Sequence, residues 1–354
     1  YRQLTLNGKT YSGVDELLLL CKMLEEMQGE EWTFQVASFL RDWLSDNPVM
    51  QLQTSGSTGK PKIIEMPKSA MIASALKTIS FLGLKAGNSA LLCLSPGYIA
   101  GKMMLVRALT GSFNLFAVEV KSNPLKDWAL DVDFAAMVPT QVEVVLNENP
   151  EALNHIKQLI IGGGAVSSSL KELLYDVSTK VWETYGMTET VSHVAIRKIA
   201  HSSHETPFTG IPGVCFSNDE RGCLVIEAPD LVSGPIVTND IVRLVDDKHF
   251  FLLGRWDNVI NTGGVKVFPE VIEKKLSTVV PHPFVVVGLP DERWGQRVVL
   301  VIEGNETAAS FSEEIIHATD RYERPREVAY VSSFPYTATG KINRLELIRL
   351  LVNR

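Results

Sequence analysis

The stretch QLQTSGSTGKPKIIEM, residues 51–66, places four hydroxyl side chains and two lysines between apolar segments. Glycine allows tight turns and a close approach of the backbone to a ligand, and hydroxyl and ammonium groups can bind phosphate oxygens. We therefore predict a phosphate-binding loop here, with a solvated hairpin loop as the alternative. The residues concerned are Thr54, Ser55, Gly56, Ser57, Thr58, Gly59, Lys60 and Lys62.

The common nucleotide-binding loop, G-x-x-x-x-G-K-[ST], does not fit this stretch. Thr54 stands where the first glycine of that motif belongs, and Pro61 follows Lys60 in place of the hydroxyl that would hold Mg²⁺. Proline also lacks the N–H that a phosphate-binding helix start would offer. The stretch therefore indicates a different phosphate-binding device.

Composition limits the class of protein. The chain has 354 residues, enough for two domains, and it is 45% hydrophobic and 21% charged, as ordinary globular proteins are. A net charge of −7 does not favour nucleic acid as a partner. Cys21, Cys93, Cys215 and Cys223 lack zinc-site spacing and favour a reducing cytoplasm. No stretch predicts membrane insertion, and the first residues do not resemble a signal peptide.

Apolar runs alternate with helix-like segments in the first two thirds of the chain. Runs at 90–95, 114–120, 134–139 and 158–164 predict buried strands, and segments 69–84 and 101–112 predict helices, the first capped by Ser69. This alternation predicts an α/β fold with a mostly parallel sheet.

The pattern changes after about residue 220. Segments 222–229 and 249–255 predict antiparallel strands. The tail follows with a helix at 269–279, strands at 283–290 and 297–304, and a last helix from about Arg344. This order predicts a small α+β unit at the C-terminus.

Four later stretches carry further polar residues. VWETYGMTETVSH (181–193) contains Tyr185, Thr188 and Glu189, which suit a base, a phosphate and Mg²⁺ respectively, although it could equally be a capped helix start. IVTNDIVRLV (236–245) ends a strand on a carboxylate, and LLGRWDNVINTGGVKVFPEVIE (252–273) combines Arg-Trp-Asp with two glycines. FPYTATGKINRLEL (334–347) contains a Gly-Lys pair that, taken alone, fits a solvated loop.

In this order, the five stretches resemble the acyl-adenylate-forming superfamily, which includes acyl- and aryl-CoA ligases, luciferases and the adenylation domains of peptide synthetases. The resemblance runs from about residue 51 to the C-terminus. It implies a large α/β domain with layered, mostly parallel sheets plus antiparallel strands, over residues 1–256. A small, mobile α+β domain would follow over residues 257–354.

The resemblance also implies site roles. Residues Thr54–Lys60 would hold the β- and γ-phosphates of ATP, and Lys341 would act on the carboxylate and the α-phosphate during adenylation. Asp257 would be the hinge between the domains. The remaining roles are adenine binding by Gly162, Gly163, Gly164, Tyr185 and Gly186, α-phosphate binding by Thr188, Mg²⁺ binding by Glu189, ribose binding by Asp240 and Arg255, and a coenzyme A face at Gly263 and Gly264.

Two departures from the family pattern stand out. Asn239 replaces the glycine of the usual Thr-Gly-Asp, although the carboxylate of Asp240 is kept. Only 53 residues precede the phosphate loop, where relatives commonly have more than a hundred. We therefore expect a shortened or absent subdomain in the large domain and a reorganised pocket wall or dimer surface, so that a homodimer stays possible.

The implied reaction has two steps. A carboxylate is a poor electrophile, and attack on the α-phosphate of ATP turns its oxygen into part of a good leaving group, AMP. The thiol of coenzyme A then attacks the acyl-AMP. The expected cofactors are thus ATP, Mg²⁺ and coenzyme A, and the expected partner is a small carboxylic acid. The resemblance implies that the small domain rotates about Asp257 between the two steps.

A second group of residues bears on which carboxylic acid the protein would bind. Tyr98 stands where relatives have a gating histidine. Lys102 and Arg107 lie on the following helix, and Ser192 and His193 follow the Tyr-Gly-Met-Thr-Glu-Thr run. Such residues suit an acid with a second carboxylate or a keto group, although each base could equally be a solvated helix charge. With the short N-terminus, the stretches resemble o-succinylbenzoate–CoA ligases of menaquinone biosynthesis. The alternatives are another aryl- or acyl-CoA ligase, or an adenylating enzyme that loads a carrier protein.

Overall fold

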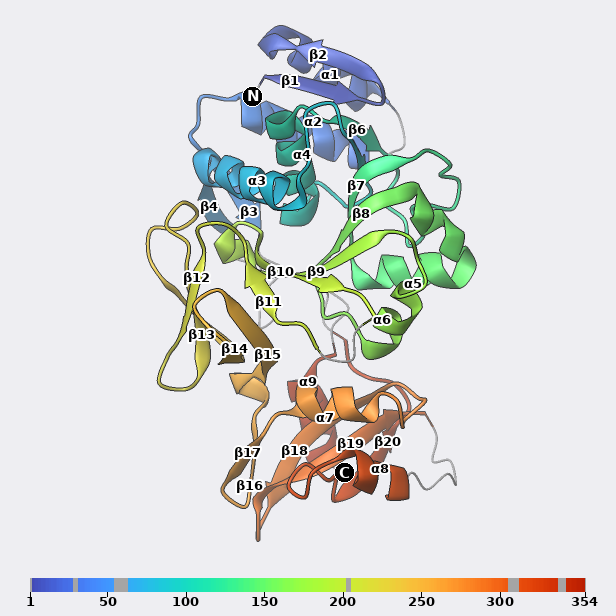
Figure 1. The fold of residues 1–354 in the computed structure, drawn as a ribbon, viewed down its shortest axis with the longest axis vertical. Coiled ribbons are helices and arrows are strands. Elements are labelled where there is room, and N and C mark those ends of the chain that lie inside the picture. The colour runs from blue at the N-terminus through green and yellow to red at the C-terminus, as the bar shows by residue number, and fades with distance from the viewer. Residues whose placement is uncertain are drawn as a thin grey trace.

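The computed structural model describes residues 2–27, 31–53, 63–201, 205–304, 312–336 and 342–353. These residues form one large sheet with helices on both faces and a second, smaller sheet below it (Figure 1). The predicted fold class, a large α/β portion followed by a small α+β portion, is confirmed.

The described strands of the large sheet number thirteen, and their pairing changes character along the sheet. From β6 through β5, β7 and β8 to β9, neighbouring strands pair in parallel. From β9 to β10 and onward to β12, neighbouring strands pair antiparallel. In sheet order, the strands are β12 (Cys215–Asn218), β13 (Cys223–Glu227), β14 (Ile236–Leu244), β15 (His249–Arg255), β11 (Phe208–Gly210), β10 (His193–Ile199), β9 (Lys180–Gly186), β8 (Ile156–Ile161), β7 (Val132–Met137), β5 (Ser89–Leu92), β6 (Asn114–Ala117), β1 (Gln3–Leu6) and β2 (Lys9–Ser12).

Helices bury both faces of the parallel strands. Along β7, Phe134 and Ala136 join the apolar cluster beneath the helices before residue 112, whereas Ala135 and Met137 join the cluster beneath the later helices. This alternation explains why the parallel strands read as continuous apolar runs. The helices are α1 (Gly13–Glu26), α2 (Glu31–Leu44), α3 (Lys68–Leu82) and α4 (Ile99–Gly111) on one side, and α5 (Pro139–Glu148), η1 (Pro150–His155) and α6 (Ser168–Leu174) on the other.

A separate two-stranded ladder joins β3 (Val49–Gln53) to β4 (Ile63–Pro67), the strands on either side of the predicted phosphate loop. Residues 54–60 themselves lie outside the described residues. The antiparallel pairing of Gln53 with Ile63 nevertheless brings the two ends of that segment together.

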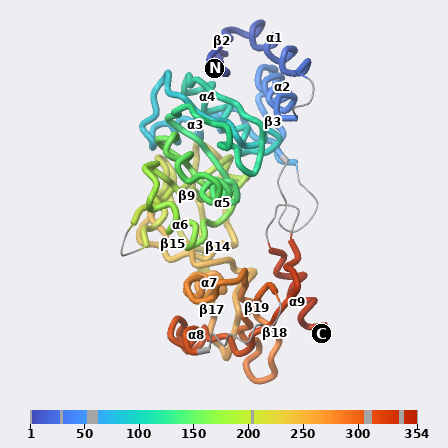
Figure 2. Tube along the Cα trace, turned by 90° about the vertical axis from the view of Figure 1, so that its right-hand side faces the viewer, coloured from blue at the N-terminus to red at the C-terminus, as the bar shows by residue number. Residues whose placement is uncertain are grey.

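The second sheet contains four antiparallel strands and one parallel edge strand, with an apolar cluster on each face. Figure 2, turned by 90°, shows its elements grouped together below the large sheet, as in Figure 1. The elements are η3 (Trp256–Asn258), β16 (Ile260–Thr262), β17 (Val265–Val267), α7 (Pro269–Leu276), β18 (Phe284–Asp291), β19 (Gly295–Glu303), α8 (Ser312–Ala318), β20 (Glu327–Val331) and α9 (Arg344–Val352).

The expected cap at Ser69 is wrong. Helix α3 begins at Lys68 and its N-cap is Pro67, with no side-chain cap. Because β4 pairs with β3 as far as Pro67, the chain passes directly from strand to helix. The first helical N–H, that of Lys68, is instead satisfied by the carbonyl of Pro48 at 2.9 Å.

The predicted strands and helices exist, but their bounds shift by a few residues. The four apolar runs all end as strands earlier than predicted, at Leu92, Ala117, Met137 and Ile161. Helix α8 and strand β20 were not predicted.

The two portions meet through polar contacts as well as through the chain. Lys274 of α7 pairs with Glu205, which precedes β11, at 2.6 Å. The large sheet ends at Arg255 and the small one begins at Ile260. The domain boundary after residue 256 remains a prediction.

None of the helices within the described ranges combines the length and the apolarity needed to span a bilayer.

One half-buried ion pair anchors the last helix, and this yields a stability prediction. Arg344 pairs with Glu273 at 2.8 Å, and both also bond the backbone of Val286. Burial raises the pKa of Glu273 and Arg344 opposes that rise. Arg344→Met should therefore leave a half-buried carboxylate without its cation and lower the free energy of unfolding of this portion by about 1–3 kcal/mol.

The matched control is the double variant Glu273→Met with Arg344→Met, which removes both charges and should be less destabilised than the single variant. Hydrogen exchange of the β18 amides would measure both. Equal or smaller destabilisation in the single variant would contradict the prediction.

Candidate active site

The candidate site centres on the connection between β9 and β10. Tyr185 and Gly186 end β9, Thr188 and Glu189 lie in η2 (Thr188–Thr190), and Ser192 and His193 lead into β10. The two strands are closest at Gly186: a Cβ there would lie 2.5 Å from the Cα of His193 and closer still to the carbonyl oxygen of Ser192. Only glycine therefore fits at position 186 without moving the opposite strand.

Val191 adopts a strained backbone conformation in this connection. Its φ of 69° and ψ of −52°, with a 2.8 Å bond from the Ser192 N–H to the Thr190 carbonyl, define a γ-turn of the rare positive-φ type. Such a conformation costs about 1–3 kcal/mol. Val191 is fully buried, and burying a valine side chain contributes about 1.5–3 kcal/mol. Packing can therefore offset the strain.

Asp240 lies at the meeting point of two predicted site residues. Its Oδ2 accepts a hydrogen bond from the Tyr185 hydroxyl at 2.6 Å, and its Oδ1 accepts one from Arg255 at 3.2 Å. The ladder between β14 and β15 sets Asp240 directly opposite Arg255. Burial and the neighbouring Asp240 carboxylate raise the pKa of Tyr185, so the phenol is neutral and donates its proton.

The ring of Tyr185 is almost fully buried. It packs edge-on against Phe250, with ring centroids 5.2 Å apart, and lies near Phe208 at 6.0 Å. The structure thus brings Tyr185, Asp240 and Arg255 together. Adenine stacking on Tyr185 and ribose binding by Asp240 and Arg255 remain predictions.

Asp257, the predicted hinge, lies in η3 directly after Arg255. Arg255 donates to its carboxylate at 3.1 Å and Asn239 does so at 3.3 Å. Asn239, the departure from the family pattern, thus contacts the predicted hinge. Arg255 therefore links the carboxylate of the large sheet to that of the connecting segment.

The glycine run lies at the end of β8. The N–H of Gly162 donates to the carbonyl of Met137 at 3.1 Å, and Gly163 has a φ of +82° that favours glycine. Gly164 follows directly. The run therefore lies at the carboxyl ends of parallel strands, where α/β proteins bind ligands.

A row of polar side chains behind Ser192 connects Arg107 and His193, two of the basic residues predicted to bind the acid. Arg107 of α4 donates to the hydroxyl of Ser192 at 3.1 Å, and Ser192 lies 3.4 Å from His193 Nδ1. His193 Nε2 lies 3.0 Å from the hydroxyl of Thr78 on α3. Ser192 is half-buried, whereas the other three side chains are buried.

This group of four polar side chains carries one positive charge. Burial lowers the pKa of Arg107 to about 10, so the guanidinium stays charged at neutral pH. Burial, with the nearby Arg107 charge, lowers the pKa of His193 well below its ordinary value, so the imidazole is neutral. Arg107 pairs with no carboxylate among the described residues, and its Nε lacks any hydrogen-bond partner there. Such a buried, unpaired cation is costly unless an anion approaches it.

Lys102 and Tyr98 do not join this group. The Lys102 ammonium lies 5.9 Å from the ring centre of Phe39 on α2, where burial lowers its pKa and Asp42 opposes that effect. Lys102 and Arg107 are five positions apart, so the two project from different faces of α4. Tyr98 precedes the helix and its side chain is exposed.

Other predicted residues lie apart. Gly263 and Gly264 form the turn between β16 and β17, with φ of 61° and 81°. Lys341, like the phosphate loop, lies outside the described residues. Its neighbours Tyr336 and Ile342 pair as an isolated antiparallel bridge.

Glu189 is the predicted Mg²⁺ ligand. No group of three or more His, Cys, Asp or Glu side chains suited to a metal occurs in the part of the chain that the structure describes. A lone carboxylate still fits Mg²⁺, which keeps several waters and takes its other oxygens from substrate phosphates.

Sequence reasoning missed three features: Thr78, Val191 and an ion network around Glu183. Glu183 of β9 is buried between Arg197 at 2.8 Å and Lys171 at 3.1 Å. Burial alone would raise the pKa of Glu183, but these two cations lower it. Arg197 also pairs with Glu205, the partner of Lys274, so the network reaches from β9 to α7. Their roles follow from no sequence pattern and become visible only through the contacts of the folded chain.

Comparison with known proteins fits this geometry. A family model described as AMP-binding enzyme matches residues 20–223, more than half of the chain. The crystal structure of an acyl-CoA synthetase (AMP-forming)/AMP-acid ligase II-like protein from Dyadobacter fermentans is 34% identical with a TM-score of 0.63, and the match covers 94% of this chain and 98% of that one.

Two further relatives are named for a particular acid. A 2-succinylbenzoate–CoA ligase of Bacillus cereus is 25% identical over 368 residues, covering 92% of this chain and 74% of that protein. The O-succinylbenzoate coenzyme A synthetase of Bacillus subtilis, solved with ATP and magnesium ion, is similar in fold at a TM-score of 0.69 and 19% identity, covering 84% of this chain and 69% of that one.

The chain therefore belongs to the family of AMP-binding enzymes. Within it, the protein is an AMP-forming acyl-CoA synthetase, which makes it an acid–thiol ligase.

The close approach at Gly186 gives a direct prediction. Gly186→Ala should push the Ser192–His193 backbone away and lower the free energy of unfolding by about 1–3 kcal/mol, the usual cost of overpacking. Urea denaturation would measure it. Gly234→Ala is the matched control, because a Cβ at Gly234 meets nothing within 4 Å, and it should stay within about 0.5 kcal/mol of wild type. Equal stability of the two variants would contradict the close approach.

Proposed function

We propose that this ligase activates o-succinylbenzoate as an acyl-AMP and transfers the acyl group to coenzyme A. The observation that carries the choice of acid is the buried, uncompensated Arg107 behind the half-buried Ser192. The domain division at residues 256/257 and the residue roles given below are part of the same proposal.

In the first step, a carboxylate oxygen of the acid attacks the α-phosphorus of ATP and pyrophosphate leaves. Asp240 and Arg255 bind the ribose, and the Tyr185 hydroxyl orients the Asp240 carboxylate. Preorganised carboxylate oxygens fix the nucleotide before charge develops at the phosphate. Thr188 binds the α-phosphate, and Mg²⁺, held by Glu189, would neutralise phosphate charge.

In the second step, the coenzyme A thiol attacks the acyl carbonyl and AMP leaves. Asp257 serves as the hinge about which the small domain turns Gly263 and Gly264 toward the site. Its contacts with Arg255 and Asn239 are exposed, and exposed ion pairs are weak. They can therefore break at a small cost in free energy when the domain rotates.

The choice of acid follows from charge. o-Succinylbenzoate carries a ring carboxylate that stays ionised while the aliphatic carboxylate reacts. The Ser192 hydroxyl can donate to that ring carboxylate, and the Arg107 guanidinium lies 3.1 Å behind the hydroxyl. Neutral His193 adds no second positive charge. A long-chain fatty acid would leave Arg107 unpaired, which disfavours it.

Another aryl- or acyl-CoA ligase activity is the alternative, followed by loading of a carrier protein. ATP–pyrophosphate exchange with a panel of acids separates the candidate acids, and thioester formation with coenzyme A separates the ligase from loading of a carrier protein. We expect exchange with o-succinylbenzoate and little with fatty or simple benzoic acids. Exchange with fatty or simple benzoic acids alone would refute the proposed acid while leaving the ligase class intact.

Arg107→Met should act on the ring carboxylate selectively. We expect kcat/KM for o-succinylbenzoate to fall about tenfold to a hundredfold, the scale of a lost charged hydrogen bond. The analogue without the ring carboxylate should be little affected. Lys102→Met on the same helix is the matched control and should leave both acids unchanged. Equal losses for both acids with Arg107→Met would argue against this role.

Lys341→Ala should separate the two half-reactions. Only adenylation develops charge at the α-phosphate beside this lysine, so exchange should fall a hundredfold or more. Thioester formation from supplied acyl-AMP should stay close to the wild-type rate. Normal exchange in this variant would remove Lys341 from the first step.

A further inference from the structure

The strained turn at Val191 has no role in the reaction as described so far. It lies between Glu189, at the phosphate end of the site, and Ser192, at the acid end. Val191 is one of three residues other than glycine with positive φ in the described part of the chain, and the other two, Asn7 and Ser112, lie elsewhere. It is also the one whose side chain is β-branched, for which this conformation is least favourable.

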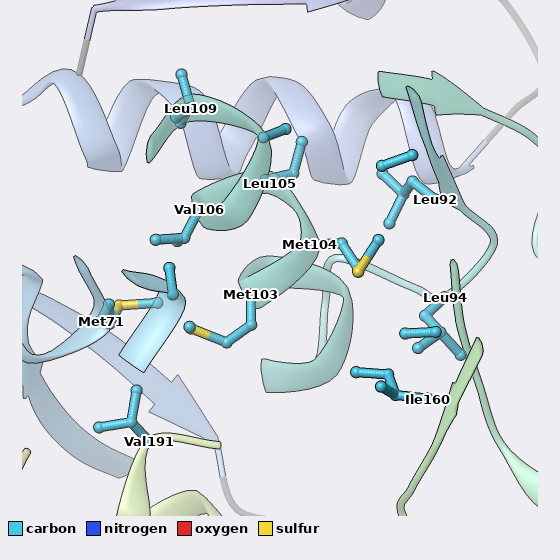
Figure 3. Packing of buried hydrophobic residues seen from close by; sticks show 14 of the residues in the cluster. Met71, Leu92, Leu94, Met103, Met104, Leu105, Val106, Leu109, Ile160 and Val191 are labelled. Carbon is cyan, nitrogen blue, oxygen red and sulfur yellow. The ribbon is translucent and has the colours of Figure 1, made fainter. Parts of the chain in front are cut away.

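Three contacts hold the turn in place. The Val191 N–H donates to the Thr188 carbonyl at 2.9 Å, and the Thr190 hydroxyl lies 2.7 Å from the Ser192 carbonyl. The Val191 side chain belongs to the apolar cluster formed by α3 and α4, and Figure 3 shows it with Met71 and Met103. Arg107 comes from the same helix α4 as Met103.

We propose that Val191 is a positioning residue: its packing against α3 and α4 imposes the γ-turn that fixes Ser192 relative to Glu189. The proposal rests on the proposed function, because it assigns the acid to Ser192 and the metal to Glu189. A relaxed residue at position 191, with negative φ, would turn the chain in another direction between these two side chains. The same helix would thus place both Arg107 and the turn that carries its partner Ser192.

The comparison of Val191→Ala with Val191→Gly tests this proposal. Both variants lose the packing, but glycine is at ease at positive φ whereas alanine is not. Val191→Gly should therefore melt roughly 2–4 °C above Val191→Ala. In ATP–pyrophosphate exchange kcat should follow the same order. Without the packing, alanine relaxes to negative φ and moves Ser192 relative to Glu189, whereas glycine can keep the turn. The kcat of the alanine variant should therefore lie about tenfold below that of the glycine variant, with KM for ATP changed less than about threefold.

Val181 supplies the matched control. It is equally buried at the other end of the same strand pair, in ordinary extended backbone. There, Val181→Gly should be the less stable variant, because glycine weakens a strand, and the kcat values of the two Val181 variants should stay within about twofold of each other.

Three results would overturn the proposal. A glycine variant at position 191 that is less stable than the alanine variant would show that the turn is not strained. Equal kcat in the two would show that the turn has only a structural role. Absence of exchange by wild-type protein with every acid would overturn the proposed function itself, and with it the role given to Val191.

Discussion

The close approach of β9 and β10 at Gly186 is the constraint on which the site depends. Because the Ser192–His193 backbone lies against a residue without a side chain, the loop from Met187 to Val191 is closed tightly. That closure places Glu189 and Ser192 on one short segment, which contains the positive-φ turn at Val191. A looser connection would leave Glu189, the proposed metal ligand, and Ser192, the proposed acid-binding residue, independent of each other.

Two kinds of polar group surround this loop, and they differ in how their charge is balanced. Asp240 is paired with Tyr185 and Arg255, and Glu183 with Arg197 and Lys171, so a cation lies beside each of these carboxylates. Arg107 has no such balance within the described ranges. An unbalanced buried charge is retained at a cost in stability, which is the usual mark of a binding function.

Sequence alone predicted much of this arrangement, and the reasons differ by residue. The parallel strands were predictable because both their faces are apolar, and the motif residues because their order matches a family. Ser69 failed as a cap because β4 runs directly into α3, a tertiary effect that local pattern cannot reveal. Lys102 and Arg107 looked equivalent as helix charges, yet packing buries only Arg107 beside Ser192. Thr78 and Val191 carry no motif, and their importance arises from contacts between α3, α4 and the β9–β10 loop.

The most direct test of the central claim is product analysis of the complete reaction. Wild-type protein would be incubated with ATP, Mg²⁺, coenzyme A and o-succinylbenzoate, and nucleotides and thioesters would be quantified by chromatography and mass spectrometry. The account predicts o-succinylbenzoyl-CoA and AMP in equal amounts. Release of ADP, or AMP formation without any thioester, would contradict it.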